Sequence, residues 1–441
     1  MASTKKNTNG INNVFIIPSG QKEYIIYLPV QGILFKANAK AVNLFYEAIS
    51  GNAGAQSKLG LSGEVVQKIN QNNNAPFPDG KKSVQFKPTT VNLFLTTDCS
   101  MQCIYCYASG GEKATRIKQE YIEIAVHEII QNALSLKKKN INVNYHGGGD
   151  IGVVWDLVEQ TTDYINRLTS ENNLKVYYSA GLNGILSDSQ REWVVKNLHS
   201  VTLSLDGDKE IQNYLRPLKN GRPSFDHVDK TLRYFDSKSF EYAIRSTITF
   251  ETVVHLERIV AFICENYNVR KIKAEPVYIQ GRASHSNVKM PDAEEFIEHF
   301  LKAKKIANSF GKELLYSGAR FETFTNSFCK ATGASFGVTP EGHITSCYEV
   351  LDTINPDSNI FFYGKIENGK IKIDQKKLDG LAAFTVNNKD KCEKCFAKFH
   401  CAGDCPVKSV QVKNNPENEN YRCIINRELT KHQLLETIEG I

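Results

Sequence analysis

At 441 residues the chain is longer than one ordinary hydrophobic core, so two or three domains are expected. Its 41% hydrophobic and 23% charged residues are typical of a globular protein, and a net charge of +6 spread over scattered lysines argues against a nucleic-acid partner. The N-terminus lacks the apolar run of a signal peptide, and no later run approaches the roughly twenty apolar residues of a membrane span, so we expect a cytoplasmic protein.

The first predicted unit is a small α+β segment over residues 1–85. The stretch 23–49, EYIIYLPVQGILFKANAKAVNLFYEAI, predicts two short strands that turn through Gln31-Gly32 and lead into an amphipathic helix. The Asn-rich stretch 67–82 predicts a linker to the next unit.

The second predicted unit, residues 86–310, alternates strand-like and helix-like segments. The expected strands are 91–97, 141–146, 174–180, 200–206, 242–250 and 269–277. Six successive βα units predict an α/β fold with a parallel sheet, either doubly wound or a partial barrel. Unusual residues cluster where these strands end, and ligands bind at that edge of parallel sheets, so the sequence predicts one shared site there.

The third predicted unit, residues 311–441, has weak periodicity and many cysteines. In a reducing compartment, clustered cysteines indicate metal binding or catalysis rather than disulfides. Of the eleven cysteines, Cys264 alone lies outside the clusters; it falls in a helical pattern and is expected to be a buried small hydrophobe.

Three cysteines, Cys99, Cys103 and Cys106, follow the first strand of the second unit. Thiolates hold iron-sulfur clusters, and a four-iron cluster with three protein ligands keeps one iron open for another molecule. The alternative is a structural zinc site completed by a distant histidine such as His146.

The segment CSMQCIYC and the following YASGG resemble the signature loop of radical S-adenosylmethionine (SAM) enzymes, and the resemblance extends over about residues 88–310. It implies a partial (β/α)6 TIM-like barrel, a 4Fe-4S cluster on the three cysteines, and SAM bound to the open iron. In that family, reductive cleavage of SAM gives a 5'-deoxyadenosyl radical that abstracts hydrogen from the substrate. The cofactor supplies the difficult chemistry and the protein orients it.

The stretch YHGGGD resembles the family's GGE motif, which binds the amino group of SAM, through Gly148, Gly149 and Asp150. Glycines let a backbone approach a ligand closely, and a carboxylate matches a positive charge. Aspartate is one methylene shorter than the family's glutamate, so this contact is expected to run through water or a neighbouring backbone oxygen.

Four further residues are assigned to SAM by the same resemblance. Ser204 in SLDG and Arg216 in YLRP match the residues that hold its ribose and carboxylate, and Asn183 and Tyr105 are also placed in the cofactor site. For Asn183-Gly184 and Asp206-Gly207, plain turn chemistry is the alternative. Arg245, within a strand, is either a site residue or a member of an internal ion pair.

Seven cysteines of the third unit, together with Gly342, reproduce the pattern of the SPASM domain, which in related enzymes carries two auxiliary 4Fe-4S clusters. Carried over by position, the implied ligands are Cys392, Cys395, Cys401 and Cys423 for one cluster, and Cys329, Cys347 and Cys405 for the other. Seven thiolates leave either an open iron or a non-cysteine ligand, for which Asp404 is a candidate. A pair of zinc knuckles is the alternative.

SPASM enzymes mostly modify peptides and proteins, so two functions compete. One is maturation of a ribosomally synthesised peptide, with thioether formation as the favoured product; the other is the formylglycine-forming reaction of anaerobic sulfatase-maturating enzymes. Those enzymes carry an additional cysteine by the first auxiliary cluster and an aspartate a little upstream. The stretch 314–329 contains neither, and Glu322, its only acid, is the only catalytic candidate. This difference favours peptide maturation.

The first unit resembles the winged-helix-like domain by which peptide-modifying enzymes bind a leader sequence as an extra strand. This interpretation predicts an exposed edge strand near Tyr24 to Leu28, whereas a capping extension over the barrel is the alternative. A flavodoxin or ferredoxin is the expected electron donor. A function of another class, electron transfer or scaffolding by a cluster-bearing protein without SAM turnover, also stays open, because Asp150 departs from the family motif.

Overall fold

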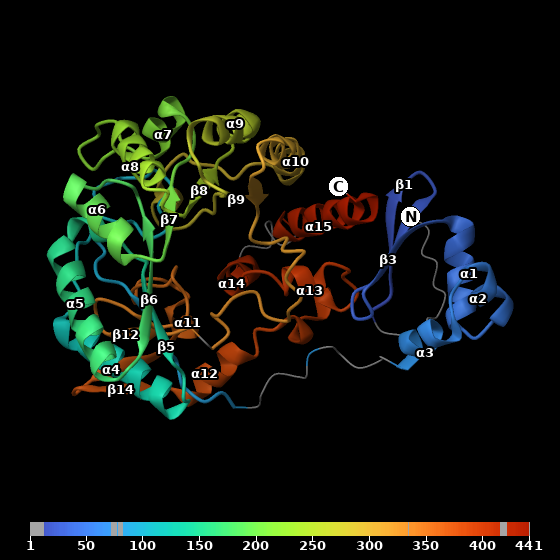
Figure 1. Cartoon of the computed structure of the whole chain (residues 1–441), viewed down its shortest axis with the longest axis horizontal. Helices are drawn as coiled ribbons and strands as arrows, with labels where there is room; N and C mark the ends of the chain where they lie inside the picture. Colours follow the sequence, from blue (N-terminus) through green and yellow to red (C-terminus); the bar gives the residue numbers. More distant parts are fainter. Residues whose placement is uncertain (1–12, 72–76, 78–82, 334, 415–420, 441) are drawn as a thin grey trace.

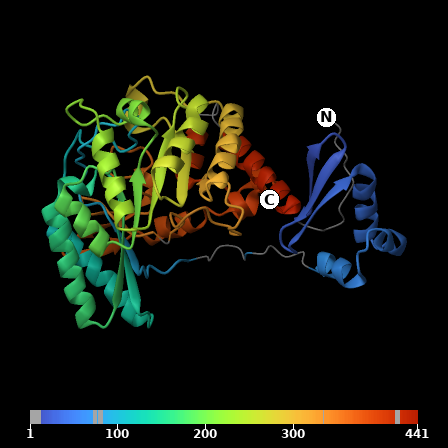
Figure 2. The same ribbon diagram turned by 45° about the horizontal axis from the view of Figure 1, so that its top comes forward.

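The computed structural model describes residues 13–71, 77, 83–333, 335–414 and 421–440. A small N-terminal unit lies at one end of the molecule and a large α/β body forms the rest, as Figures 1 and 2 show. No helix among these residues is both long enough and apolar enough to span a bilayer.

The large body is built on an 11-stranded sheet in the order β10-β9-β8-β7-β6-β5-β4-β11-β12-β13-β14. Its first seven strands are β10 (Glu313–Leu315), β9 (Lys271–Pro276), β8 (Tyr242–Ile248), β7 (Ser200–Ser204), β6 (Lys175–Leu182), β5 (Asn140–Tyr145) and β4 (Thr90–Leu93). All pairs among these seven are parallel. The predicted α/β fold with a partial barrel is confirmed.

Helices cover the outer face of the parallel strands (Figure 1). They are α4 (Gln119–Ser135), α5 (Trp155–Glu171), α6 (Asp188–Asn197), α7 (Lys209–Leu215), α8 (Phe225–Ser237), α9 (Leu256–Asn266) and α10 (Ala293–Ser309), with short 3-10 turns η1 (Ile151–Val153), η2 (Val253–His255) and η3 (Gly281–His285). Side chains alternate along each strand, so Tyr242, Ile244 and Ile248 of β8 join the hydrophobic core. Cys264 is buried on α9, as predicted.

The C-terminal segment continues the same sheet. β11 (Gly337–Val338) pairs parallel with β4, and β12 (His343–Thr345), β13 (Phe362–Glu367) and β14 (Lys370–Ile373) follow antiparallel. Its helical pieces are α11 (Ser358–Phe361), α12 (Gln375–Ala382), η4 (Val386–Asn388), η5 (Asp390–Cys392), α13 (Lys398–Cys401), α14 (Pro406–Asn414) and α15 (Tyr421–Glu439). β10 also lies past residue 310, so the boundary predicted there divides one continuous sheet.

The N-terminal unit is a three-stranded antiparallel sheet followed by three helices. Its elements are β1 (Phe15–Gly20), β2 (Glu23–Leu28), β3 (Ile33–Asn38), α1 (Ala39–Ile49), α2 (Ala53–Lys58) and α3 (Gly63–Gln71). The order β1-β2-β3 makes β2 the central strand, so the prediction of an edge strand at Tyr24 to Leu28 is wrong. The strand β1, which was not predicted from the sequence, occupies one side of β2. The predicted linker 67–82 begins inside α3, and most of its remainder lies outside the described residues.

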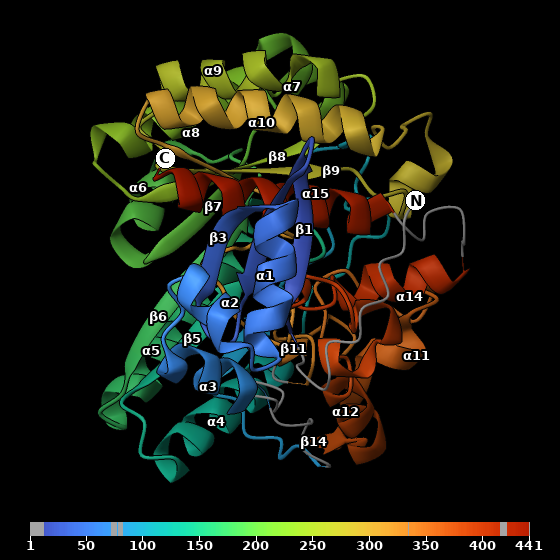
Figure 3. The same cartoon turned by 90° about the vertical axis from the view of Figure 1, so that its right-hand side faces the viewer.

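The two faces of this small sheet have different partners. Ile26 and Leu28 pack with Phe45 of α1, while Ile25 and Tyr27 pack with Leu434 of α15. Figures 2 and 3 show α15 running alongside α10 and ending against the blue sheet. Burial on both faces explains the hydrophobic run of β2, which reads IIYL rather than a clean alternation.

Candidate functional site

The loop that carries Cys99, Cys103 and Cys106 follows β4 and is held by backbone hydrogen bonds from the neighbouring turns. The N–H of Gln102 donates to the carbonyl of Pro217 at 2.8 Å, and that of Ile104 to the carbonyl of Leu215 at 3.0 Å. These bonds fix the loop across the C-terminal edge of the parallel strands.

Arg282, which was not predicted from the sequence, fastens the same loop from the other side. Its guanidinium donates to the carbonyls of Cys103 and Gly110, each at 2.8 Å, and its backbone N–H donates to Cys106 O at 2.9 Å. Gly281 permits this approach, because a Cβ there would lie 2.3 Å from Tyr107 O. The available signal was the position of Gly281-Arg282 just after a strand end.

The glycine-rich loop after β5 packs directly on the start of the cysteine loop. A Cβ at Gly149 would lie 1.7 Å from Asp98 O, and one at Gly148 would lie 2.7 Å from Thr96 O. The N–H of Gly149 donates to Thr96 O at 2.9 Å. The glycines predicted to approach SAM are therefore also required for the contact between these two loops.

Asp150 is buried and joins this loop to the end of β6. Its carboxylate accepts the N–H of Asn183 at 2.7 Å and that of Gly152 at 2.8 Å. Burial raises the pKa of Asp150 to about 6, although these two hydrogen bonds act in the opposite direction. The Asn183 amide in turn donates to Ser100 Oγ at 3.0 Å and to Cys99 Sγ at 3.6 Å. Two residues assigned to SAM by sequence thus lie beside the cysteine loop.

Tyr105 and Arg216 meet at a buried carboxylate. The phenol of Tyr105 and Nε of Arg216 both donate to Asp206, the latter at 2.8 Å, and the N–H of Thr247 donates to the same side chain at 2.9 Å. Nη1 of Arg216 lies 3.8 Å from Cys103 Sγ. The sequence allowed Asp206 to be either a turn residue or a ligand-binding residue. In the structure it holds Tyr105 and Arg216, two residues predicted to bind SAM.

Burial raises the pKa of two thiols of the triplet, Cys99 and Cys103. Desolvation is the main cause that raises the pKa of Cys99 to about 12 and that of Cys103 to about 11; Cys103 and Cys106 add to the effect on Cys99, and Cys106 adds to the effect on Cys103. These contributions indicate that the three thiols lie near one another, and thiols must lose their protons when a cluster binds. The donor set fits an iron-sulfur cluster held by three residues.

The histidine suggested as the fourth ligand of a zinc site in this loop has another neighbour. His146, the suggested fourth ligand, packs instead against Tyr348, with ring centroids 4.6 Å apart.

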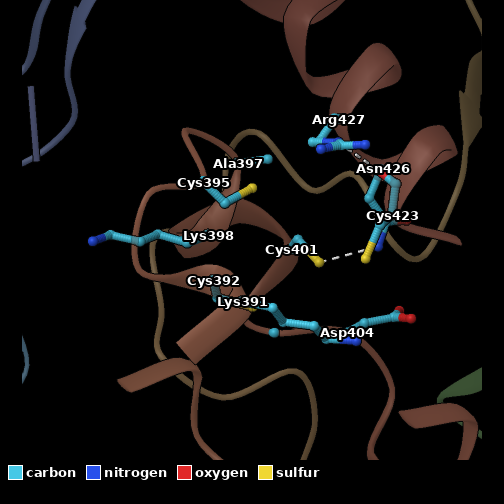
Figure 4. A pocket seen from close by; sticks show the side chains of 11 residues that line it. Lys391, Cys392, Cys395, Ala397, Lys398, Cys401, Asp404, Cys423, Asn426 and Arg427 are labelled. Atoms are coloured by element: carbon cyan, nitrogen blue, oxygen red, sulfur yellow. Dashed lines mark hydrogen bonds between the residues drawn. The ribbon is translucent and has the colours of Figure 1, made fainter. Parts of the chain in front are cut away.

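Four C-terminal cysteines line one pocket, shown in Figure 4: Cys392, Cys395, Cys401 and Cys423. The amide of Asn426 donates to Cys401 Sγ at 3.0 Å, and Lys391, Lys398 and Arg427 also line the pocket. Four thiols with surrounding cations fit a cluster that carries net negative charge. This is the set predicted for one auxiliary cluster.

The other predicted set is also gathered. Burial raises the pKa of Cys347, and Glu349, Cys405 and Cys329 add to the effect. Asp404, suggested as a further ligand, is instead bound by Nε of Arg422 at 2.8 and 2.9 Å. Three thiols thus come together with a carboxylate, Glu349, that sequence reasoning did not single out.

Two predicted residues make no polar side-chain contact in the part of the chain that the structure describes. Ser204 ends β7 half-buried on the inner face of the barrel, in register with Arg245 of β8. Glu322 is exposed in the turn after β10. Their roles stay predictions.

Comparison with known proteins agrees with this geometry. Residues 93–263 match the model of the radical SAM superfamily. The cysteine-type anaerobic sulfatase-maturating enzyme of Clostridium perfringens is 22% identical over 346 residues, which cover 74% of this chain and 91% of that enzyme.

Two solved structures show the same fold. Native anSMEcpe with bound AdoMet has a TM-score of 0.62 and 18% identity, with 80% of this chain and 100% of that one covered. Streptococcus suis SuiB bound to precursor peptide SuiA has a TM-score of 0.52 and 14% identity, with 88% and 93% covered. Residues 93–263 therefore form a radical SAM domain, which implies a 4Fe-4S cluster and SAM as cofactors.

Proposed function

We propose that this enzyme matures a ribosomally synthesised peptide, with a thioether as the favoured product. The observation that carries the proposal is the N-terminal unit, a three-stranded sheet with three helices that is docked on α15. When bound, the cluster and SAM supply a 5'-deoxyadenosyl radical that takes hydrogen from a peptide carbon. Arg282, Asp150 and the Asp206-Arg216 pair hold the loops of that site in place.

The small sheet offers one edge for a leader peptide. β2 is the central strand, so among the described strands of this sheet the outer edges belong to β1 and β3. Pro18 in β1 has no N–H to donate, and proline is a common protection of an edge strand. The edge of β3 is therefore the proposed site for an added strand. SuiB, which shares the fold, has been solved with its precursor peptide.

Sulfatase maturation is the second candidate. It is supported by the match to the Clostridium perfringens enzyme and by anSMEcpe, which has also been solved with a peptide, Cp18Cys. However, anSMEcpe is covered over its whole length while a fifth of this chain has no counterpart in it. The added segment favours a substrate that needs a separate recognition unit.

The first experiment is anaerobic reconstitution with iron and sulfide, followed by SAM and either dithionite or a flavodoxin or ferredoxin donor. Formation of 5'-deoxyadenosine is expected, and the Cys99, Cys103 and Cys106 to Ala variant should form none. If fully loaded protein behaved like that variant, SAM turnover would be ruled out and a scaffold or electron-transfer role would replace it.

The second experiment separates the two substrates. A short precursor peptide encoded beside the gene should bind to the full chain, and the binding should weaken when Phe35 on β3 is replaced by Pro. The Pro substitution at Ile16 on β1 is the matched control. Modification of a sulfatase peptide, with no effect of either change, would favour the sulfatase alternative.

A further inference from the structure

Two cationic side chains lie side by side on the inner face of the barrel. Arg245 of β8 is in register with Lys273 of β9, and neighbouring strands are about 4.8 Å apart, so both head groups can reach one small group. Ile244 and Ser246 are buried whereas Arg245 between them is exposed. Arg245 therefore projects from the inner face into open space.

Neither cation has an anionic partner in the part of the chain that the structure describes. No carboxylate there lies within ion-pair distance of Arg245 or Lys273. Glu275, two residues further along β9, instead accepts the N–H and the hydroxyl of Ser317, both at 2.9 Å. The ion-pair alternative left open for Arg245 by its sequence is thus not what the structure shows.

The two cations are unfavourable for each other. Burial lowers the pKa of Lys273 and Arg245 lowers it further, whereas Glu275 raises it by a smaller amount, so the net shift is downward. Arg245 and Lys273 also lower the pKa of the buried His146. Like charges placed together at a protein surface of reduced polarity cost free energy unless an anion joins them. The arrangement is that of a binding site for a negatively charged group.

The position of the pair indicates which molecule brings that group. Ser204, predicted to contact SAM, is in register with Arg245 on one side. On the other side, Glu275 and Ser317 connect β9 to the C-terminal segment. The pair therefore lies between the predicted SAM site and the C-terminal segment.

We propose that Arg245 and Lys273 bind a carboxylate of the peptide substrate, either the side chain of an Asp or Glu residue or the C-terminal carboxylate. The proposal rests on the proposed peptide-modifying function. Arginine binds carboxylates through two parallel hydrogen bonds, and the adjacent ammonium adds a second positive charge. The carboxylate of SAM itself is assigned to Arg216, which leaves this pair for the substrate.

Binding of small probes to the anaerobically reconstituted, SAM-loaded protein tests the proposal without turnover. Isothermal titration calorimetry at low salt compares N-acetylglutamate amide, its neutral analogue N-acetylglutamine amide, and N-acetylglycine, which carries a C-terminal carboxylate. One or both carboxylates are expected to bind about tenfold more tightly than the neutral analogue. The tighter of the two identifies the source of the carboxylate, and equal binding of all three probes overturns the proposal.

Substitutions of Arg245 and Lys273 test whether the probe binds at these two residues. Arg245→Gln and Lys273→Gln should each weaken the preferred carboxylate probe about tenfold, whereas Arg245→Lys should retain most of the affinity. Arg258→Gln, on the exposed surface of α9 in an ion pair with Asp208, is the matched control. If both Gln variants bound the probe as tightly as the parent protein, the carboxylate would bind elsewhere and the proposal would be wrong.

A SAM-binding measurement completes the test. Equilibrium dialysis with labelled SAM should give the same affinity for Arg245→Gln and the parent protein, which also shows that the variant is folded. If Arg245→Gln instead lost SAM affinity about tenfold while Lys273→Gln bound the probes normally, the anion would be the carboxylate of SAM and the proposal would be wrong. Absence of 5'-deoxyadenosine would refute the proposed function separately, because probe binding needs no turnover.

Discussion

At the scale of single residues, glycine positions decide whether the cluster loop and the SAM loop can touch. Gly148 and Gly149 meet the carbonyls of Thr96 and Asp98 at distances no Cβ tolerates. Sequence reasoning assigned these glycines to a ligand, and the structure adds the loop contact as a second requirement. A side chain at either position would therefore disrupt the contact between the two loops even when no cofactor is bound.

The substitution Gly149→Ala is therefore expected to destabilise the protein by about 3 kcal/mol and to abolish SAM cleavage, because Asp98 must move to admit the methyl group. Thermal unfolding and 5'-deoxyadenosine formation measure the two effects. Gly380→Ala on α12, where a Cβ meets nothing within 4 Å, is the control and should be neutral or slightly stabilising. If the Gly149→Ala variant kept the stability of the parent protein, this packing would not be required.

The Asp206-Arg216 pair makes a second residue-scale prediction. Arg216→Met leaves the fully buried carboxylate of Asp206 without its cation, at an expected cost of about 3 to 5 kcal/mol in urea unfolding. The double variant Arg216→Met with Asp206→Asn removes the uncompensated charge and should recover a large part of that loss. Equal losses in the single and double variants would contradict a role for the buried charge.

At the scale of elements, the N-terminal sheet is joined to the cysteine segment by one buried hydrogen bond. Tyr27 of β2 and Nε2 of His400, which precedes Cys401, are 2.6 Å apart, and Phe321 stacks on the imidazole with ring centroids 4.9 Å apart. A strand near the N-terminus thus contacts α13, which ends at Cys401, a predicted ligand of an auxiliary cluster.

Tyr27→Phe should loosen this docking by about 1 to 2 kcal/mol, because the imidazole loses a buried partner. Hydrogen exchange of β1 to β3 should become faster while exchange of the barrel strands stays unchanged. Tyr24→Phe on the same strand has no such bond to lose and is the control. Exchange rates that are identical in both variants would argue that the hydrophobic contacts alone dock the unit.

At the scale of the whole molecule, one chain gathers its cysteines into three separate groups. The first lies at the edge of the parallel strands, the second lines the pocket of Figure 4, and the third lies around Cys347. The grouping predicts three clusters rather than one. The iron content of the protein measures this number directly.

Reconstituted protein should hold roughly twelve irons and twelve sulfides per chain, and the combined Cys392→Ala and Cys395→Ala variant should lose about a third of them. Cys264→Ala removes a buried thiol of α9 that belongs to no group and should change nothing. Chemical iron analysis and Mössbauer spectra give the count. A parent protein with about four irons would limit the enzyme to its SAM-binding cluster.

The sequence alone determined the six βα units, because each strand has its own hydrophobic or alternating pattern and each helix its own period. The spacing of Cys99, Cys103 and Cys106 also indicated one metal centre, whereas the two C-terminal cysteine sets came from the resemblance to SPASM domains. Arg282 was not predicted because it lies far along the chain from Cys103 and Gly110, whose carbonyls it binds. Glu349 follows Cys347 by two residues, and only the structure brings it close to Cys405 as well.

Only the tertiary structure decided features that depend on which segments meet. The sequence predicted that β2 would be an edge strand, but it is the central strand of its sheet. The reason is that β1, which comes before the stretch predicted to form strands, pairs with its other side. Asp206 resembled a turn residue until folding buried it against Arg216. Arg245 and Lys273 are 28 residues apart in the chain and become neighbours through strand register alone. Spacing along a chain encodes local chemistry, whereas charge partners and sheet edges are set by long-range packing.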